Sequence, residues 1–220
     1  MRTMVIAPHP DDEVLGCGGT LLKRKRSGHE IAWTIVTRMN ASSFPQEKIE
    51  LREQEIKDVS EAFNFDFTDQ VSLEASSLDS LPLSLIIERL KEPINFFKPT
   101  DLFLPHYGDA HSDHRAVFNA CISFTKWFRY PSIKNIFLYE TISETDFCTI
   151  SSGSFQPNYF VNISDFLEKK MEIMAIYHSE MGDFPFPRSR EAIISLAKIR
   201  GAASGFRAAE AFQVFKLREE

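Results

Sequence analysis

The stretch Met4-Val5-Ile6-Ala7-Pro8-His9-Pro10-Asp11-Asp12-Glu13 decides how this chain folds. Its four leading apolar residues predict a buried strand, and a cluster of imidazole and carboxylate side chains follows at once. The same order recurs later, where Leu102-Phe103-Leu104 predicts a strand and His111-Ser112-Asp113-His114 comes a few residues after it. Each cluster of His and Asp therefore follows the end of a predicted strand.

Predicted strands and helices alternate around these two stretches. Apolar, β-branched runs predict strands, and apolar residues spaced by three or four positions predict helices. The predicted strands cover residues 3–7, 31–37, 102–105, 136–140 and 159–163, and the predicted helices cover residues 16–27, 46–64, 83–97, 114–127, 165–177 and 189–204. The alternation over the first half is typical of βαβ units. Since no repeat or linker interrupts the chain, we expect residues 1–220 to form a single α/β domain with a mostly parallel sheet flanked by helices.

The two His/Asp clusters are expected to meet in space. In sheets of parallel strands, ligands bind beyond the carboxyl ends of the strands. His9 and His111 each lie a few residues past such an end, so they can converge although they are far apart in the chain. Gly16, Gly18 and Gly19 do not have the spacing of a dinucleotide-binding turn, and the acidic residues before them would repel a pyrophosphate.

Three of the converging residues suit a divalent metal. His9, Asp12 and His114 offer two imidazoles and one carboxylate, which zinc accepts, and their origin in two loops leaves one side open to water and substrate. Zinc is the metal we expect, although the residues also allow another divalent ion such as Fe²⁺. A water molecule bound at such a centre becomes acidic enough to act near neutral pH.

The neighbouring residues suit proton transfer. Asp11 is placed to take the proton from water, and His111 is placed to stabilise an oxyanion or to donate to a leaving group. Asp113 or Asp109 could hold the imidazole in orientation. A hydrolytic metalloenzyme is therefore the leading interpretation. The competing one is that the acidic residues only stabilise the start of a helix, a role that we assign mainly to Glu13.

Composition limits the partners. The net charge of −6 and the pI near 5.6 argue against nucleic acid. The three cysteines are widely spaced and form no CxxC motif, so a disulfide framework is not expected. No apolar run reaches the roughly 18 residues of a membrane span. We expect a cytoplasmic protein with no transmembrane segment, and contact with a lipid-linked substrate stays open.

The two motifs resemble those of a known family. Ala7-Pro8-His9-Pro10-Asp11-Asp12-Glu13 and His111-Ser112-Asp113-His114 look like the two signatures of the LmbE-like, or PIG-L, deacetylases. Arg52-Glu53-Gln54-Glu55 and the C-terminal segment from Arg200 to Phe212 also resemble this family. The resemblance implies a Rossmann-like fold and a zinc-dependent enzyme that removes acetyl groups from N-acetylglucosamine-type sugars and their conjugates.

The resemblance also implies roles for individual residues. His9, Asp12 and His114 match the zinc ligands, and Asp11 matches the general base. His111 matches the residue that stabilises the tetrahedral intermediate or protonates the amine, and Asp113 matches its orienting partner. Arg52 matches a position often near the substrate, although a surface arginine on a helix is an equally good interpretation. Ser112 departs from the family's usual proline and faces no obvious chemistry.

The expected reaction is amide hydrolysis of an N-acetylated sugar, free or carried on a nucleotide, lipid or glycan. Two alternatives stay open: a de-N-acylase or esterase that acts on a non-sugar compound at the same site, and a non-catalytic protein that binds metal or sugar. The intact pair Asp11 and His111 argues against mere binding. The family resemblance also implies that the protein could form a homo-oligomer.

Overall fold

The computed structural model describes residues 1–148 and 153–219. Its strands are β1 (Arg2–Ala7), β2 (Glu30–Arg38), β3 (Phe67–Glu74), β4 (Asp101–Pro105), β5 (Asn135–Tyr139), β6 (Tyr159–Asn162) and β7 (Ala209–Lys216). Its α-helices are α1 (Asp12–Arg26), α2 (Gln46–Phe63), α3 (Leu83–Phe97), α4 (Ser112–Cys121), α5 (Leu167–Met174) and α6 (Arg190–Ser204). Short 3₁₀ turns cover Leu78–Ser80, Ile122–Thr125 and Thr145–Phe147.

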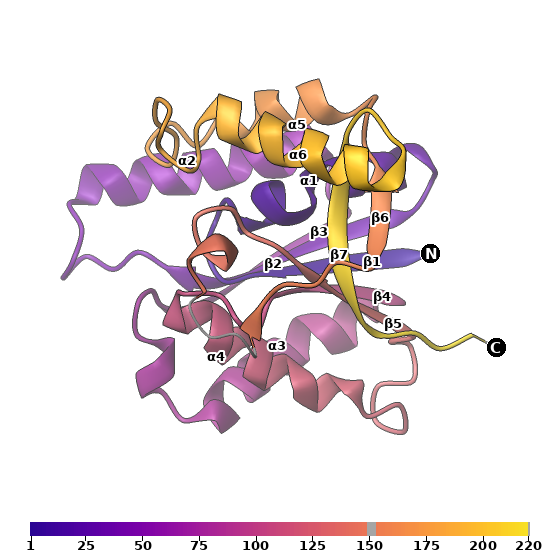
Figure 1. The fold of residues 1–220 in the computed structure, drawn as a ribbon. Helices are drawn as coiled ribbons and strands as arrows, with labels where there is room; N and C mark the ends of the chain where they lie inside the picture. The colour runs from indigo at the N-terminus through magenta and orange to yellow at the C-terminus, as the bar shows by residue number, and fades with distance from the viewer. Residues whose placement is uncertain (149–152, 220) are drawn as a thin grey trace.

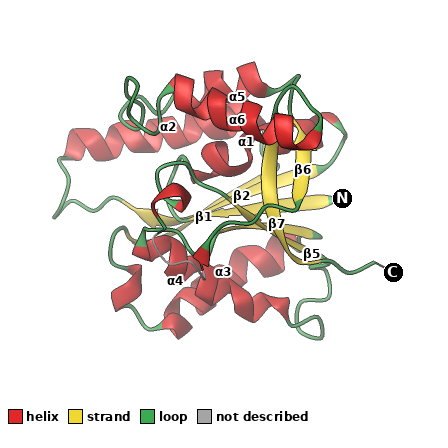
Figure 2. Cartoon of the chain, in the orientation of Figure 1, coloured by secondary structure: helices red, strands yellow, loops and turns green. Residues whose placement is uncertain are grey.

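The strands form one mixed sheet, shown in yellow in Figure 2. The order is β3-β2-β1-β4-β5-β7-β6. The first five strands in this order pair in parallel, whereas β7 runs antiparallel to both β5 and β6. The predicted α/β class with a mostly parallel sheet is therefore confirmed.

Helices cover both faces of this sheet (Figure 1). Helices α1, α2, α5 and α6 lie on one face, and α3 and α4 lie on the other. The side chains of β1 alternate between the two layers, because Val5 and Ala7 join the first core whereas Met4 and Ile6 join the second. A parallel strand that is buried on both faces needs apolar residues at every position, which accounts for the unbroken run at 4–7.

Several elements differ from their predicted bounds. Helix α1 begins at Asp12 rather than residue 16, so the first His/Asp cluster runs directly into the helix. The predicted helix at 114–127 is an α-helix from Ser112 to Cys121 that continues as a 3₁₀ turn. Strands β3 and β7 were not expected, and α5 is shorter than the predicted segment 165–177. Within the described ranges, no helix is long and apolar enough to span a membrane.

The sheet order explains where a site can form. Strand β1 lies between β2 and β4, and the connections from β1 and from β4 leave toward opposite faces of the sheet, through α1 and α4. Such a point of reversal opens a crevice beyond the carboxyl ends of the two strands. His9 follows β1 and His111 follows β4, so both predicted clusters lie at this crevice.

Candidate metal centre and active site

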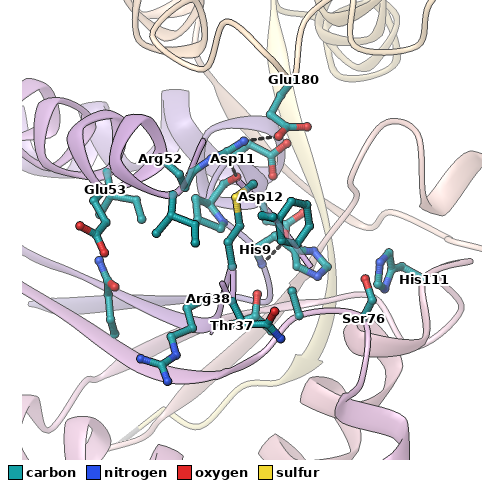
Figure 3. A pocket seen from close by; sticks show the side chains of 18 of the residues that line it. His9, Asp11, Asp12, Thr37, Arg38, Arg52, Glu53, Ser76, His111 and Glu180 are labelled. Atoms are coloured by element: carbon teal, nitrogen blue, oxygen red, sulfur yellow. Dashed lines mark hydrogen bonds and ion pairs between the residues drawn. The ribbon is translucent and has the colours of Figure 1, made fainter. Parts of the chain in front are cut away.

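The side chains of His9, Asp12 and His114 form one compact cluster (Figure 3 labels the first two). His9 Nδ1 lies 3.6 Å and His114 Nε2 lies 3.3 Å from the same oxygen, Asp12 Oδ2. One ligand atom from each residue lies within 4.8 Å of the others. The backbone N–H of His9 also donates to Asp12 Oδ2 at 2.8 Å, which fixes the carboxylate in the turn. The convergence predicted for these three residues is therefore present.

Each imidazole of the cluster is held from behind by a carboxylate. His9 Nε2 lies 3.0 Å from Asp113 Oδ2, and His114 Nδ1 lies 2.8 Å from Asp109 Oδ2. Asp109 is held in turn by the hydroxyl of Thr145, which donates to Oδ1 at 2.7 Å. With one ring nitrogen of each histidine engaged in this way, the other nitrogen faces Asp12 and is the one placed to bind a metal ion. Metal-binding histidines in proteins have this arrangement.

The electrostatics of the cluster favour a positive charge at its centre. Burial alone would lower the pKa of His9, but hydrogen bonds to Asp113 and Asp12 outweigh burial and raise the pKa to about 9. The pKa of His114 is also raised well above its usual value, because Asp12 and Asp109 outweigh burial. The pKa of Asp12 is lowered, since both imidazoles favour its carboxylate form against burial. Two nitrogens and a carboxylate that stabilise positive charge fit a divalent cation.

Asp11 lies beside this cluster in a strained conformation. Its φ of 121° is rare for a residue with a side chain, and its backbone N–H donates to Glu13 Oε2 at 3.1 Å. This turn separates the Asp11 side chain from that of Asp12, so the two adjacent carboxylates take different positions. Burial, followed by the negative charges of Asp12 and Glu180, raises the pKa of Asp11 well above its usual value. A carboxyl group with a raised pKa is suited to accept a proton near neutral pH.

His111 is oriented by the backbone rather than by a carboxylate. It precedes α4, and its Nδ1 accepts a hydrogen bond from the backbone N–H of Asp113 at 3.1 Å. Because Nδ1 accepts, the proton of the neutral ring resides on Nε2 and is available for donation. Burial and the positive charges of His9 and His114 lower the pKa of His111, which favours this neutral form.

Asp113 contacts both His9 and His111. Its carboxylate lies 3.0 Å from His9 Nε2 and its backbone N–H donates to His111 Nδ1, so its expected role in orienting His111 stays a prediction. The backbone N–H groups of Ser76 and Leu78 donate to its two oxygens at 2.6 Å and 3.0 Å. The hydrogen bond to His9 and these two N–H groups outweigh burial and lower the pKa of Asp113. Asp113 therefore connects the segment after β3 to the metal cluster.

Arg52 lines the pocket but is engaged by protein groups. Its guanidinium donates to the carbonyl of Pro10 at 3.1 Å and to the hydroxyl of Ser179 at 3.2 Å. It also forms ion pairs with Glu55, at 3.2 Å, and with Glu180 (Figure 3). These contacts join the loop of the first motif to the segment after α5. Its expected role in substrate binding stays a prediction.

The crevice opens into a pocket of about 680 Å³. His9, Asp11, Asp12, His111 and His114 line it, together with residues from α2, from the ends of β2 and β3, and from the segments after β5 and α5. Glu144, Glu180 and Arg188 also line the pocket, and no motif in the sequence had indicated them. Glu180 itself ends the segment Tyr177-His178-Ser179-Glu180, which resembles the family only loosely.

Comparisons with known proteins show which family this chain resembles. The family model described as "PIG-L: GlcNAc-PI de-N-acetylase" matches residues 4–125, more than half of the chain. A diacetylchitobiose deacetylase from Thermococcus kodakarensis is 26% identical over 95% of this chain and 81% of its own length. A probable N-acetyl-α-D-glucosaminyl L-malate deacetylase from Bacillus cereus is 22% identical over 81% of this chain and 83% of its own.

A solved structure shares the fold. The N,N'-diacetylchitobiose deacetylase from Pyrococcus horikoshii superimposes with a TM-score of 0.77, covering 98% of this chain and 84% of its own. At 21% identity, this likeness shows the fold alone. The matched segment 4–125 contains most of β1, all of β4 and both His/Asp motifs, so the family match and the observed cluster rest on the same residues.

Proposed function

Since this chain belongs to the PIG-L family, we propose that it is a zinc-dependent hydrolase that removes the acetyl group from an N-acetylated sugar or sugar conjugate. The family is one of metal-dependent deacetylases, and the choice of zinc is our proposal. One observation carries the proposal: a cluster of His9, Asp12 and His114 lies in a pocket beside Asp11 and His111. Mere metal binding needs the first three residues, whereas hydrolysis also needs a base and an oxyanion donor.

His9, Asp12 and His114 would hold the metal, with His9 and His114 oriented by Asp113 and Asp109. A divalent metal supplies Lewis-acid polarisation and makes a neighbouring water molecule more acidic. The open side of the cluster faces the pocket, so the acetyl group can reach it.

Asp11 accepts a proton from the attacking water as the new C–O bond forms. Its raised pKa lets the carboxyl group hold that proton through the following step. His111 donates a hydrogen bond from Nε2 to the carbonyl oxygen as negative charge develops there. When the C–N bond breaks, the proton passes from Asp11 to the departing nitrogen. The products are acetate and the free amino sugar.

The test is acetate release from N-acetylglucosamine and its conjugates, measured on zinc-loaded protein, on chelated protein and on the variants Asp11→Asn and Glu61→Gln. We expect release only with metal, a loss of at least about a hundredfold in kcat for Asp11→Asn with metal content unchanged, and no change for Glu61→Gln. Glu61 is an exposed carboxylate on α2 outside the pocket and serves as the matched control.

Other results would change the conclusion. Full turnover by Asp11→Asn with metal bound would refute the assignment of Asp11 as the general base. No release from any sugar, but release from non-sugar amides or acetyl esters, would show a different hydrolase at the same site. Metal binding without any turnover would favour a binding protein. The cytoplasmic location and the homo-oligomer also remain proposals, to be checked by fractionation and by light scattering.

A further inference from the structure

Three arginines line the pocket. Two of them form hydrogen bonds and ion pairs with other groups of the protein. The guanidinium of Arg52 binds Pro10, Ser179 and two glutamates, as described above. The guanidinium of Arg188 donates to the carbonyl of Glu180 at 2.8 Å, to the carboxylate of Glu180 at 3.2 Å and to the hydroxyl of Ser143 at 3.0 Å. Both side chains therefore already have anionic partners within the fold.

The third arginine, Arg38, ends β2 at the side of the pocket away from His111 in Figure 3. Its guanidinium has no hydrogen-bond or ion-pair partner among the described residues. Glu74 is its neighbour in register on β3, but the carboxylate of Glu74 accepts a hydrogen bond from the side chain of Asn40 instead. Glu53 also lines this side of the pocket and forms no ion pair with Arg38. Arg38 thus keeps all its donors available.

The carboxylates that line the pocket are concentrated around the cluster of His9, Asp12 and His114 and are fewer near the end of β2. Asp11, Asp12, Glu144 and Glu180 surround the metal cluster, so an additional anion would be repelled there. Near the end of β2 the pocket is lined by one carboxylate, Glu53, and by the neutral side chains Gln70 and Ser72 of the neighbouring strand β3. A pocket of about 680 Å³ has room for a group beyond a single sugar ring.

We propose that Arg38 is a specificity-determining residue that binds an anionic group, a carboxylate or a phosphate, on the part of the substrate beyond the N-acetyl sugar. A guanidinium binds either group through two parallel N–H donors, and within residues 1–148 and 153–219 no carboxylate forms an ion pair with Arg38. The inference rests on the proposed deacetylase function, and it adds that the preferred conjugates carry negative charge.

The test uses substrate pairs that differ in charge. One pair is the 4-carboxyphenyl and the 4-carbamoylphenyl β-glycoside of N-acetylglucosamine, which have nearly the same shape. The second pair is N-acetylglucosamine 1-phosphate and the methyl glycoside. Acetate release is measured on the zinc-loaded wild type and on Arg38→Ala, Arg38→Lys and Lys57→Ala. Lys57 is an exposed cation on α2 outside the pocket, so its variant controls for the loss of one positive charge.

We expect the wild type to prefer the charged member of at least one pair. Arg38→Ala should lower kcat/KM for that member about 10- to 100-fold, mainly through KM, and leave the neutral member unchanged. Arg38→Lys should keep only part of the preference for the charged member, because the positive charge remains but the planar pair of donors is lost. Lys57→Ala should behave as the wild type. The pair that responds identifies the anion.

Two results would overturn the inference while the proposed function stands. The first is equal turnover of charged and neutral substrates by the wild type. The second is an equal loss toward both members of a pair in Arg38→Ala, which would show that Arg38 supports the fold of the pocket and does not select charge. Release from none of the four compounds, together with none from N-acetylglucosamine itself, would count against the proposed function instead.

Discussion

His9 Nε2 lies 3.0 Å from Oδ2 of Asp113, a residue 104 positions further along the chain. Asp113 lies in the first turn of α4, and its carboxylate also accepts hydrogen bonds from the N–H groups of Ser76 and Leu78. One carboxylate therefore connects the loop after β1, the helix after β4 and the segment after β3. Its position determines which nitrogen of His9 faces the metal cluster.

We therefore predict that Asp113→Asn weakens metal binding. The amide cannot stabilise a His9 ring that donates from Nε2 as well as a carboxylate does, and loss of such a partner typically lowers metal affinity about 10- to 100-fold. The measurement is the zinc dissociation constant by competition with a chelator. Asp109→Asn should have a similar effect, because Asp109 holds His114 in the same way. An unchanged affinity together with a shifted pH profile of kcat would instead support the expectation that Asp113 acts on His111.

The meeting of the two motifs is predictable from the sequence, whereas this contact is not. Apolar runs that predict parallel strands place His9 and His111 at one edge of the sheet, because the carboxyl ends of β1 and β4 lie together. Which imidazole a carboxylate contacts depends on the backbone conformation of each loop, which can shift a side chain by a few ångströms. The φ of 121° at Asp11 and the path of residues 76–78 decide this, and neither leaves a pattern in the sequence.

The two unexpected strands have a similar explanation. Strand β3 lies at the edge of the sheet, where only one side pairs, so Phe67-Thr-Asp-Gln-Val-Ser-Leu-Glu carries apolar residues at just three positions. Strand β7 is flanked by β5 and β6 and contains Glu210, whose carboxylate is buried and satisfied by α1. Glu210 interrupts the apolar pattern that would predict a strand, and the sequence does not reveal that its charge is compensated by a hydrogen-bond partner 190 positions away.

The buried carboxyl group of Glu13 predicts a dependence of stability on pH in the metal-free protein. Burial raises its pKa to about 8, against the opposing hydrogen bonds from Tyr177 and from the Asp11 N–H. The pKa in the unfolded chain is near 4.5. As the pH rises from about 4.5 to about 8, the unfolded chain loses this proton and the folded chain keeps it, so stability falls by at most about 1.4 kcal/mol per pH unit.

Urea denaturation of chelated protein at pH 5, 6.5 and 8 measures this effect, with Glu13→Gln as the comparison. The glutamine cannot titrate, so the stability of the variant should fall less over this range than that of the wild type. His9 also has a raised pKa and remains in both proteins, so the difference between them reports Glu13 together with its effect on the neighbouring Asp11. The same slope in both proteins would show that Glu13 is ionised in the folded state.

The buried ion pair between Lys170 and Glu210 is expected to contribute strongly to the stability of the fold. Both are buried, and Lys170 Nζ lies 2.7 Å from Glu210 Oε1 and donates to the carbonyl of Leu15 at 2.8 Å. The Glu210 carboxylate also accepts the N–H groups of Gly19 and Thr20 at 2.8 Å and 2.7 Å, just after the point where Cys17 interrupts the regular geometry of α1. It therefore caps the second part of that helix.

We expect Glu210→Ala to destabilise the protein by about 3–5 kcal/mol, since it leaves a buried ammonium without its counter-ion and two helical N–H groups without an acceptor. Adding Lys170→Met should recover part of this loss, because the unpaired charge is then removed. Equilibrium denaturation of the two single variants and the double variant gives the coupling energy. Additive effects would show that the two side chains act independently.

Gly16 and Gly18 form a matched pair within α1. A Cβ atom at Gly16 would lie 2.3 Å from Tyr139 Cδ2, whereas a Cβ at Gly18 would lie 3.4 Å from Val14 and 3.5 Å from Lys170. The Tyr139 ring cannot move aside easily, because it is fully buried and its hydroxyl donates to the carbonyl of Ile6 at 2.9 Å.

Gly16→Ala should therefore destabilise the protein by about 1–3 kcal/mol through overpacking. Gly18→Ala makes only ordinary contacts and should be neutral or stabilise the helix by up to about 1 kcal/mol. Urea denaturation of both metal-free variants compares their stabilities directly. The carbonyl that Tyr139 binds belongs to Ile6, three residues before the proposed metal ligand His9, so zinc affinity should fall in Gly16→Ala alone. If both variants have the wild-type stability and affinity, then the close packing of α1 against β5 does not support the metal centre.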